Sequence, residues 1–169
     1  MRNLIKITAV VFLMAAAATV NAQEPKFGHV DLQALIQVMP ERAAAEAEIN
    51  KFQSEMEDVF GDLQKDLQAK MDEFDKLGKD VSEVKRNAKL AELQDLQQRI
   101  QNYQVTAQQQ LNQKNNELMK PVYDKAVAAI GEVAKELGLL YVFEVNTLLY
   151  KSNNSVDILP QAKKKLGIN

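Results

Sequence analysis

Side chains that commonly perform chemistry are scarce in this chain of 169 residues. It holds one histidine, His29, and no cysteine, so a metal site or a histidine-based catalytic triad has little material. We expect His29, within a predicted strand, to be a packed structural residue. The carboxylates of MDEFDKLGKD lack the alternating ligands and the glycine of a calcium loop, and no phosphate-binding glycine loop follows a strand. The sequence therefore predicts a protein that is not an enzyme, with no catalytic residue, metal or cofactor.

The first 22 residues have the pattern of a secretory signal peptide: a short basic start, an apolar run, and small residues before Gln23. An uncleaved membrane anchor is the less favoured alternative. We predict cleavage after Ala22 and export of the remaining chain. No later segment approaches about 18 consecutive apolar residues, so we expect no stable insertion into a membrane.

The charge of the exported chain argues against one class of partner. Loss of Arg2 and Lys6 with the leader leaves 19 basic against 23 acidic residues. A protein that binds nucleic acid would show a basic face, so we expect no nucleic-acid partner.

Residues 41–120 have helix-forming composition, rich in Ala, Glu, Gln, Lys and Leu. Gly78 could adopt the left-handed conformation that ends a helix, and Asp80 with Glu83 resembles a capping box that starts another. We therefore predict an antiparallel helical hairpin with its tip at residues 78–82. Apolar residues recur on both sides of this tip at steps of three and four: Ile49, Phe52, Met56, Val59 and Leu63 before it, and Leu93, Leu96, Ile100, Tyr103 and Ala107 after it.

The same heptad pattern predicts which side chains fill the seam between the two helices. Met56 and Tyr103 are predicted to face each other across the hairpin. Val59 fits the heptad, so Phe60 beside it is expected to point off the seam. A local stutter follows, with Leu67 and Met71 at steps of four before Phe74 restores a step of three.

Two prolines are predicted to mark the base of the hairpin. If the tip is centred near residue 80, Pro40 lies level with Pro121. Proline suits the first turn of a helix and kinks a helix interior. The arm therefore spans residues 41–120, and each leg is about 60 Å long at 1.5 Å per residue. We consider Gly61, in a helix interior, and Pro121 as candidate hinges.

Residues 23–40 and 121–169 are predicted to form a small, strand-rich body. We expect a strand and a short helix before the arm, and a helix ending at Gly138 after it. LLYVFEV and TLLYK are then expected to be strands around a turn at Asn146, SNNSVDI a loop, and PQAKKKLG a final helix. Three short strands make a poor core, and LLYVFEV is apolar on both faces. We therefore predict that the body completes itself by self-association.

Three stretches of the chain resemble the Skp/OmpH family of periplasmic chaperones. KFGHVDLQALIQVMPE is similar to the family's opening strand and first helix, DLQAKMDEF to its outgoing arm, and GLLYVFEVNTLLYKSNNSVDIL to its closing strands, Asn turn and Asp-Ile segment. The resemblance implies an α+β, mainly α protein in the periplasm. It implies a homotrimer in which three chains complete a β-barrel body and three helical arms enclose a cavity. Unfolded outer-membrane proteins would be held in that cavity without ATP.

The chain departs from the best-known members of this family in the charge of its arm. Residues 41–120 carry 16 acidic and 12 basic residues, whereas those members have basic arms. Capture of clients by positive charge, and contact with lipopolysaccharide, therefore do not transfer to this chain.

The apolar pattern and the resemblance together give candidate functional residues. One other function stays open: a structural coiled-coil adaptor of the cell envelope would explain the hairpin but not the strand-rich base. The candidate client-binding residues are Met56, Phe60, Met71, Phe74 and Tyr103. The candidate oligomerisation residues are Phe27, Val30, Leu140, Tyr141, Val142, Phe143, Val145, Leu148 and Leu149.

Overall fold

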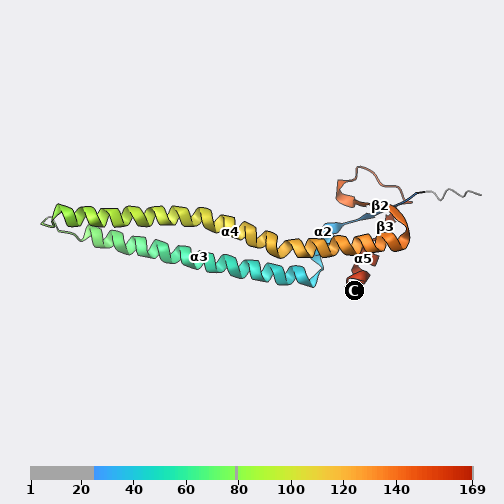
Figure 1. Ribbon diagram of the computed structural model, residues 1–169, viewed down its shortest axis with the longest axis horizontal. Helices are drawn as coiled ribbons and strands as arrows, with labels where there is room; N and C mark the ends of the chain where they lie inside the picture. Colours follow the sequence, from blue (N-terminus) through green and yellow to red (C-terminus); the bar gives the residue numbers. More distant parts are fainter. Residues whose placement is uncertain (1–24, 79, 169) are drawn as a thin grey trace, which may run out of the picture.

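The computed structural model describes residues 25–78 and 80–168, and the predicted signal peptide lies outside these residues. Figure 1 shows a long arm of two helices attached at one end to a small body of strands and short helices. The predicted α+β, mainly helical class is thereby confirmed. The elements are β1 (Lys26–Val30), α2 (Leu32–Gln37), α3 (Pro40–Asp75), α4 (Glu83–Leu137), β2 (Leu139–Glu144), the 3-10 helix η2 (Val145–Thr147), β3 (Val156–Asp157) and α5 (Leu159–Lys165).

The outgoing helix α3 ends without a left-handed residue. Its C-cap, Lys76, has right-handed backbone angles and donates its N–H to the Asp72 carbonyl, and the N–H of Leu77 donates to the Phe74 carbonyl. The prediction that Gly78 takes the left-handed conformation is wrong, because only Gly138 and Gly167 have positive φ among the described glycines. These two hydrogen bonds already close the end of the helix, so no left-handed residue is needed there.

The returning helix α4 begins two residues later than the predicted capping box. Ser82 is the N-cap, and its hydroxyl accepts a hydrogen bond from the N–H of Lys85. Asp80 is therefore not the cap. Serine and aspartate both suit this position, and the local sequence offers both, so composition alone could not choose between them.

Helix α4 carries the arm back and continues into the body without a break. Pro121 lies in its interior, where the missing N–H and the ring favour a bend. Figure 1 shows the course of α4 changing between the arm and the body. The helix ends at Gly138, which has a φ of 64° and takes the left-handed C-cap position that the sequence predicts.

The sheet has the order β2-β1-β3, and both pairs of strands are parallel. Parallel neighbours need a long crossover, and the arm with α4 forms the connection from β1 to β2. One face of the sheet packs on α4, where Val30, Val133 and Ile158 are buried together. Gly28 lies on this face, and a Cβ there would sit 2.6 Å from Leu139 Cδ1. We call this side the core face.

Two predicted elements of the body are wrong. TLLYK, residues 147–151, is not a strand, and β3 lies in the stretch SNNSVDI that was expected to be a loop. TLLYK cannot pair with β1, because one edge of β1 already pairs with β2 and the other with β3. Residues 147–151 pair with no strand in the described part of the chain. Leu149 and Tyr150 are accordingly 105% and 82% exposed.

A second buried cluster joins the base of the arm to the body. The short helix α2 is capped by Asp31, whose Oδ1 accepts a hydrogen bond of 2.8 Å from the N–H of Ala34. Its apolar face packs against α3, α4 and α5. The buried members of the cluster are Leu35, Ile36, Met39, Ala45, Val122, Ala126 and Ala162.

Glu144, at the end of β2, connects the sheet to α2. Its Oε2 accepts a hydrogen bond of 2.9 Å from the N–H of Leu32, and its Oε1 accepts the side-chain amide of Asn146 at 3.0 Å. Because both bonds are to a charged carboxylate, we expect Glu144→Ala to lower the free energy of unfolding by about 1–2 kcal/mol. Urea unfolding followed by circular dichroism measures this loss. Glu48→Ala, on the exposed side of α3, is the matched control, and an equal loss in both variants would contradict the role of Glu144.

Candidate interaction surfaces

The side of the sheet opposite the core face carries three neighbouring aromatic rings. Phe27 stacks on Tyr141 with ring centroids 6.3 Å apart and planes 7° apart, and Phe143 lies 6.4 Å from Phe27 and 6.1 Å from Tyr141. All three side chains are exposed. A register irregularity between Lys26 and Phe27 puts Tyr141 opposite Phe27, so Leu140 is the extra residue of the strand. We call Phe27, Tyr141 and Phe143 the aromatic face.

Most of the predicted oligomerisation residues lie at or beside this aromatic face. Leu140 and Leu149 are exposed like the three rings, whereas Val142, Val145 and Leu148 are half-buried. Val30 is different, because it is 3% exposed and packs in the core face against Val133. Its assignment to an assembly contact is therefore wrong: in β1, Val30 alternates with His29 and points to the opposite side of the sheet. For the others, contact with a second chain stays a prediction.

The segment of residues 145–155 folds back over part of the aromatic side of the sheet. Leu148, Tyr150 and Lys151 line a hollow of about 760 Å³ together with Phe27 and Phe143. Beside it, the ring of His29 is only 4% exposed, which agrees with its predicted packed position. Both ring nitrogens have partners in the segment: Nδ1 lies 2.9 Å from Ser155 Oγ, and Nε2 lies 2.8 Å from Lys151 Nζ.

In the arm, the structure confirms that Met56 and Tyr103 face each other. The Tyr103 hydroxyl donates a hydrogen bond of 3.0 Å to the Met56 carbonyl. These two residues and Phe60 line a groove of about 310 Å³ between α3 and α4, which also includes Ala107 and Leu111. Among the predicted client-binding residues, these three are therefore together, on the line where the two helices meet.

The predicted positions of Val59 and Phe60 are exchanged. Phe60 is half-buried and faces α4, whereas Val59 is 47% exposed. The half-buried apolar residues of α3 run at steps of four through Phe52, Met56 and Phe60, so the stutter occurs there and not after Leu63. The two possible registers differ by one residue, and both place an apolar side chain in the seam. The sequence pattern alone could not separate them.

The position of Met71 is affected by the same shift. Met71 is 41% exposed, while Phe74 is half-buried and lies under Arg86, whose guanidinium carbon is 5.8 Å from the ring centroid. Met71 is therefore available to another molecule, and Phe74 is largely occupied within the arm.

Several exposed apolar side chains of the arm escaped the sequence analysis. Each is out of phase with the seam, and that signal would have identified them. Unlike scattered surface residues of a compact domain, they stand on an arm that is only two helices thick. Together with Val59 and Met71 of α3, the exposed apolar residues of the arm are Val59, Met71, Val84, Leu90 and Val105. We call these five the exposed arm residues.

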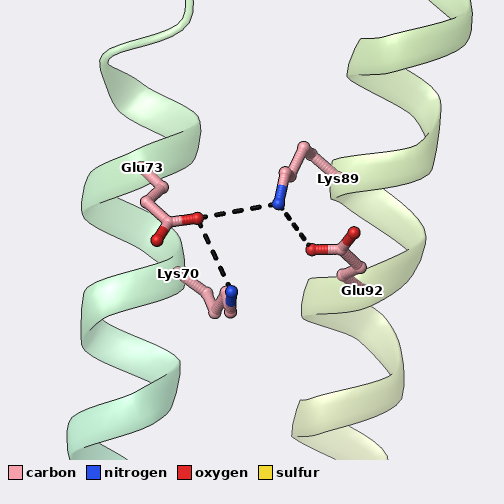
Figure 2. A network of polar contacts seen from close by, with 4 residues as sticks. All are labelled: Lys70, Glu73, Lys89 and Glu92. Atoms are coloured by element: carbon pink, nitrogen blue, oxygen red, sulfur yellow. Dashed lines mark hydrogen bonds and ion pairs between the residues drawn. The ribbon is translucent and has the colours of Figure 1, made fainter.

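Ion pairs connect α3 and α4 near the tip, as Figure 2 shows. Lys89 Nζ lies 3.6 Å from Glu73 Oε2 across the helices and 2.8 Å from Glu92 Oε2 on its own helix, and Lys70 Nζ lies 3.6 Å from Glu73 Oε2. The hydrogen bond from Lys89 lowers the pKa of Glu92, and Glu92 raises the pKa of Lys89. The groups are accessible to water, so the network orients the helices and adds little stability.

A second ion pair connects the helices at the base of the arm. The Lys125 ammonium donates to the Glu41 carboxylate and lowers the pKa of Glu41. The two ends of the arm are therefore held by charge pairs, and the apolar groove lies between them.

The described residues offer neither a metal centre nor a membrane span. Residues 25–78 and 80–168 contain no group of three or more His, Cys, Asp or Glu side chains that could hold a metal ion. No described helix is both long enough and apolar enough to cross a membrane. The surfaces that remain for function are the aromatic face, the arm groove and the exposed arm residues.

Comparisons with known proteins agree with this architecture. A family model described as outer membrane protein (OmpH-like) matches residues 26–166. An uncharacterized protein of Aquifex aeolicus (strain VF5) is 29% identical over 140 residues, which are 83% of this chain and 85% of that protein. The crystal structure of a candidate outer membrane chaperone (OmpH-like) from Caulobacter crescentus CB15 matches with a TM-score of 0.73 over 88% of each chain, at 13% identity. The last similarity is one of fold.

Proposed function

The chain belongs to the OmpH-like family of outer membrane proteins, and we propose that it is an ATP-independent holdase that binds unfolded outer-membrane β-barrel proteins in the periplasm. The resemblance to the Skp/OmpH chaperones is confirmed by the family match. This family is a chaperone family and not a family of enzymes, so the prediction that the chain is not an enzyme is confirmed as well. Client binding, the homotrimer and the removal of a signal peptide are proposals.

The observation that carries the holdase proposal is the set of exposed arm residues. A helical hairpin whose only role is structural would place its apolar side chains in the seam and leave a polar surface. Here five apolar side chains point out of the seam along the arm. Valine, leucine and methionine side chains at spaced positions can contact many different apolar segments, which suits a protein that must hold unrelated clients.

The homotrimer is supported by unpaired apolar surface on the body. The three rings of the aromatic face are exposed, and Leu149 and Tyr150 project from a segment without a strand partner in the described chain. A second copy of the chain could cover the rings and supply the missing strand edge to residues 147–151. Closure of this contact among three chains would give the barrel that the resemblance implies.

We propose that Gly61 and Pro121 are hinges of the arm. A Cβ on Gly61 would meet no atom within 4 Å, so packing does not require glycine there. Glycine in a helix interior costs about 1 kcal/mol against alanine, and a flexible point is a physical reason to keep it. Pro121 lies at the base of the arm, where α4 enters the body. Bending at these two levels would change the width of the space between arms.

Dilution of a urea-denatured outer-membrane β-barrel protein tests the holdase proposal. We expect the chain from Gln23 onward to suppress the light scattering of the aggregating client at equimolar trimer, with no nucleotide present. The matched control lacks residues 41–120 and has a short Gly/Ser bridge, and it should suppress much less because it has no arm. Equal aggregation with and without the full chain would favour the envelope adaptor, which has no need to bind unfolded protein.

A further inference from the structure

The middle of the returning helix is rich in amide side chains and carries no charge. Residues 100–113 of α4 contain no Asp, Glu, Lys or Arg, and eight of these 14 residues are Gln or Asn. In a pair of packed helices, the positions that flank the seam usually carry opposite charges that pair between the helices. In the described part of the arm, ion pairs between α3 and α4 occur only at its two ends, at Glu73–Lys89 and Glu41–Lys125. Between these ends, α4 has amides where charges are expected.

Six amide side chains of α4 form a single stripe on the helix surface beside the seam. Their positions differ by three or four residues, so they lie on one side of α4. Gln104 and Gln108 line the arm groove of about 310 Å³, and Asn115 lines a second hollow nearer the base, between α2, α3 and α4. All six side chains are exposed. We call them the amide stripe: Gln97, Gln101, Gln104, Gln108, Asn112 and Asn115.

The amide stripe has apolar surface on both of its sides. Toward the seam, Ala107 and Leu111 line the same groove as Gln104 and Gln108. Away from the seam, Val105 is 61% exposed, and it lies three residues before Gln108 in the helix. A chain that followed the stripe would therefore meet amides along its length and apolar side chains on either side.

A side-chain amide has the hydrogen-bonding chemistry of a peptide group, with N–H donors and a carbonyl acceptor. The bond of 3.3 Å from Gln108 to Asn112 uses one donor and one acceptor, so both side chains can form further bonds. An unfolded polypeptide exposes main-chain N–H and C=O groups, which are the same at every residue except proline. Uncharged amides can therefore bond to any extended segment, whereas charged side chains favour segments of opposite charge.

We infer that the amide stripe binds the main chain of an extended segment of an unfolded client. This inference rests on the proposed holdase function and names the chemistry by which the arm recognises its clients. From Gln97 to Asn115 the stripe is about 27 Å long at 1.5 Å per residue, which matches about eight residues of extended chain. Bonds to the main chain do not depend on client sequence, and apolar contacts such as those of Val105 add to them.

Two peptides that differ only in their main chain test this inference. One is a fluorescein-labelled peptide of about eight alternating leucine and serine residues. The other carries methyl groups on alternate main-chain nitrogens, which removes the N–H donors on one side of the extended chain. We expect the chain from Gln23 onward to bind the first peptide about tenfold more tightly in fluorescence anisotropy, the effect of about one or two hydrogen bonds. Equal affinity for the two peptides, or binding of neither, would overturn the inference.

Two variants separate main-chain bonding from the bulk of the methyl groups. Methionine keeps the length and helix propensity of glutamine but removes its amide. The stripe variant combines Gln101→Met, Gln104→Met and Gln108→Met. The matched control changes three amides outside the linings of the groove and the hollow: Gln109→Met, Gln110→Met and Gln113→Met. The preference for the unmethylated peptide should fall to about twofold or less in the stripe variant and stay about tenfold in the control. An unchanged preference in the stripe variant, or an equal loss in both variants, would contradict the inference.

Failure of this inference and failure of the holdase proposal give different results. If wild type suppresses client aggregation but has no preference between the peptides, the holdase proposal stands and the inference is wrong. If wild type does not suppress client aggregation, the holdase proposal itself is wrong. A lower particle mass of the stripe variant in light scattering would assign the stripe to contact between copies, and would also overturn the inference.

Discussion

Replacing Leu149 and Tyr150 together with aspartate is expected to reduce the particle mass in solution to one third. Both side chains are almost fully exposed in the single chain and follow the aromatic face. Burial of each by a neighbouring copy would contribute about 1.5–3 kcal/mol, and a buried unpaired aspartate would cost more than that gain. Because each chain of a ring contributes the same contact, the loss is repeated at every interface. Light scattering coupled to size-exclusion chromatography measures the mass.

Two controls locate the assembly contact in the body. Val84→Asp places the same charge on an exposed apolar residue near the arm tip and should leave the mass of the trimer unchanged. Replacement of residues 41–120 by a Gly/Ser bridge should also leave three chains together. A monomeric wild-type chain, or a monomer after removal of the arm alone, would contradict the proposed body-centred trimer.

Replacing Val59, Met71 and Val105 together with serine is expected to weaken client holding by about tenfold and to leave the helix content unchanged. The three side chains are exposed and out of phase with the seam, so the arm does not need them. Partial burial of each against a client would contribute about 0.5 kcal/mol, and three such contacts add up to about 1.4 kcal/mol, which is one factor of ten. The concentration of chaperone that halves client aggregation measures holding, and circular dichroism measures the helix.

The seam residues provide the opposite control. Phe60→Ser and Leu63→Ser remove half-buried side chains from between α3 and α4, so both should lower the helix content first and client holding as a result. If Phe60→Ser lost holding at full helicity, the groove at Met56, Phe60 and Tyr103 would itself be a client site. If the triple serine variant held clients like wild type, the exposed arm residues would not be the client surface.

The salt dependence of client holding, measured in the same assay, distinguishes apolar contact with the client from attraction between charges. Residues 41–120 are net acidic, and Lys70 and Lys89 near the tip are paired with carboxylates. Holding should therefore change little between roughly 50 and 300 mM salt, where exposed charge pairs become screened. A steep loss of holding over this range would show that charge dominates.

The arm could be predicted from the sequence because its signals are local and repeated. Helix-forming composition, the starting Pro40, the stopping Gly138 and the apolar steps of three and four all indicate the same hairpin, and the structure has it. The fine register was harder. Val59 and Phe60 are adjacent and both apolar, and an error of one residue turned the surface side chain inward and the seam side chain outward.

The sheet was less predictable because strands depend on distant partners. TLLYK has the composition of a strand, yet β1 has no free edge for it in the described chain. Val156–Asp157 sits in a stretch with loop composition and becomes a strand only through two register partners in β1, Gly28 and His29. The contact of His29 with Lys151 spans 122 residues of sequence and has no local signal.

The central position of β1 also sets the order in which the protein can form. Its partners, β2 and β3, are separated from it by the whole arm, so β1 gains its first partner only after residue 144 has been delivered and its second only after residue 157. In the arm, the residues of α3 and α4 that pair near the tip are close in sequence. The entropy lost on closing such a short loop is small, so the two helices can begin to pair at the tip. During export, a chain delivered only as far as the end of α4 would therefore be a hairpin without a sheet. Such a chain would lack Tyr141 and Phe143, so it could not present the aromatic face to a second copy.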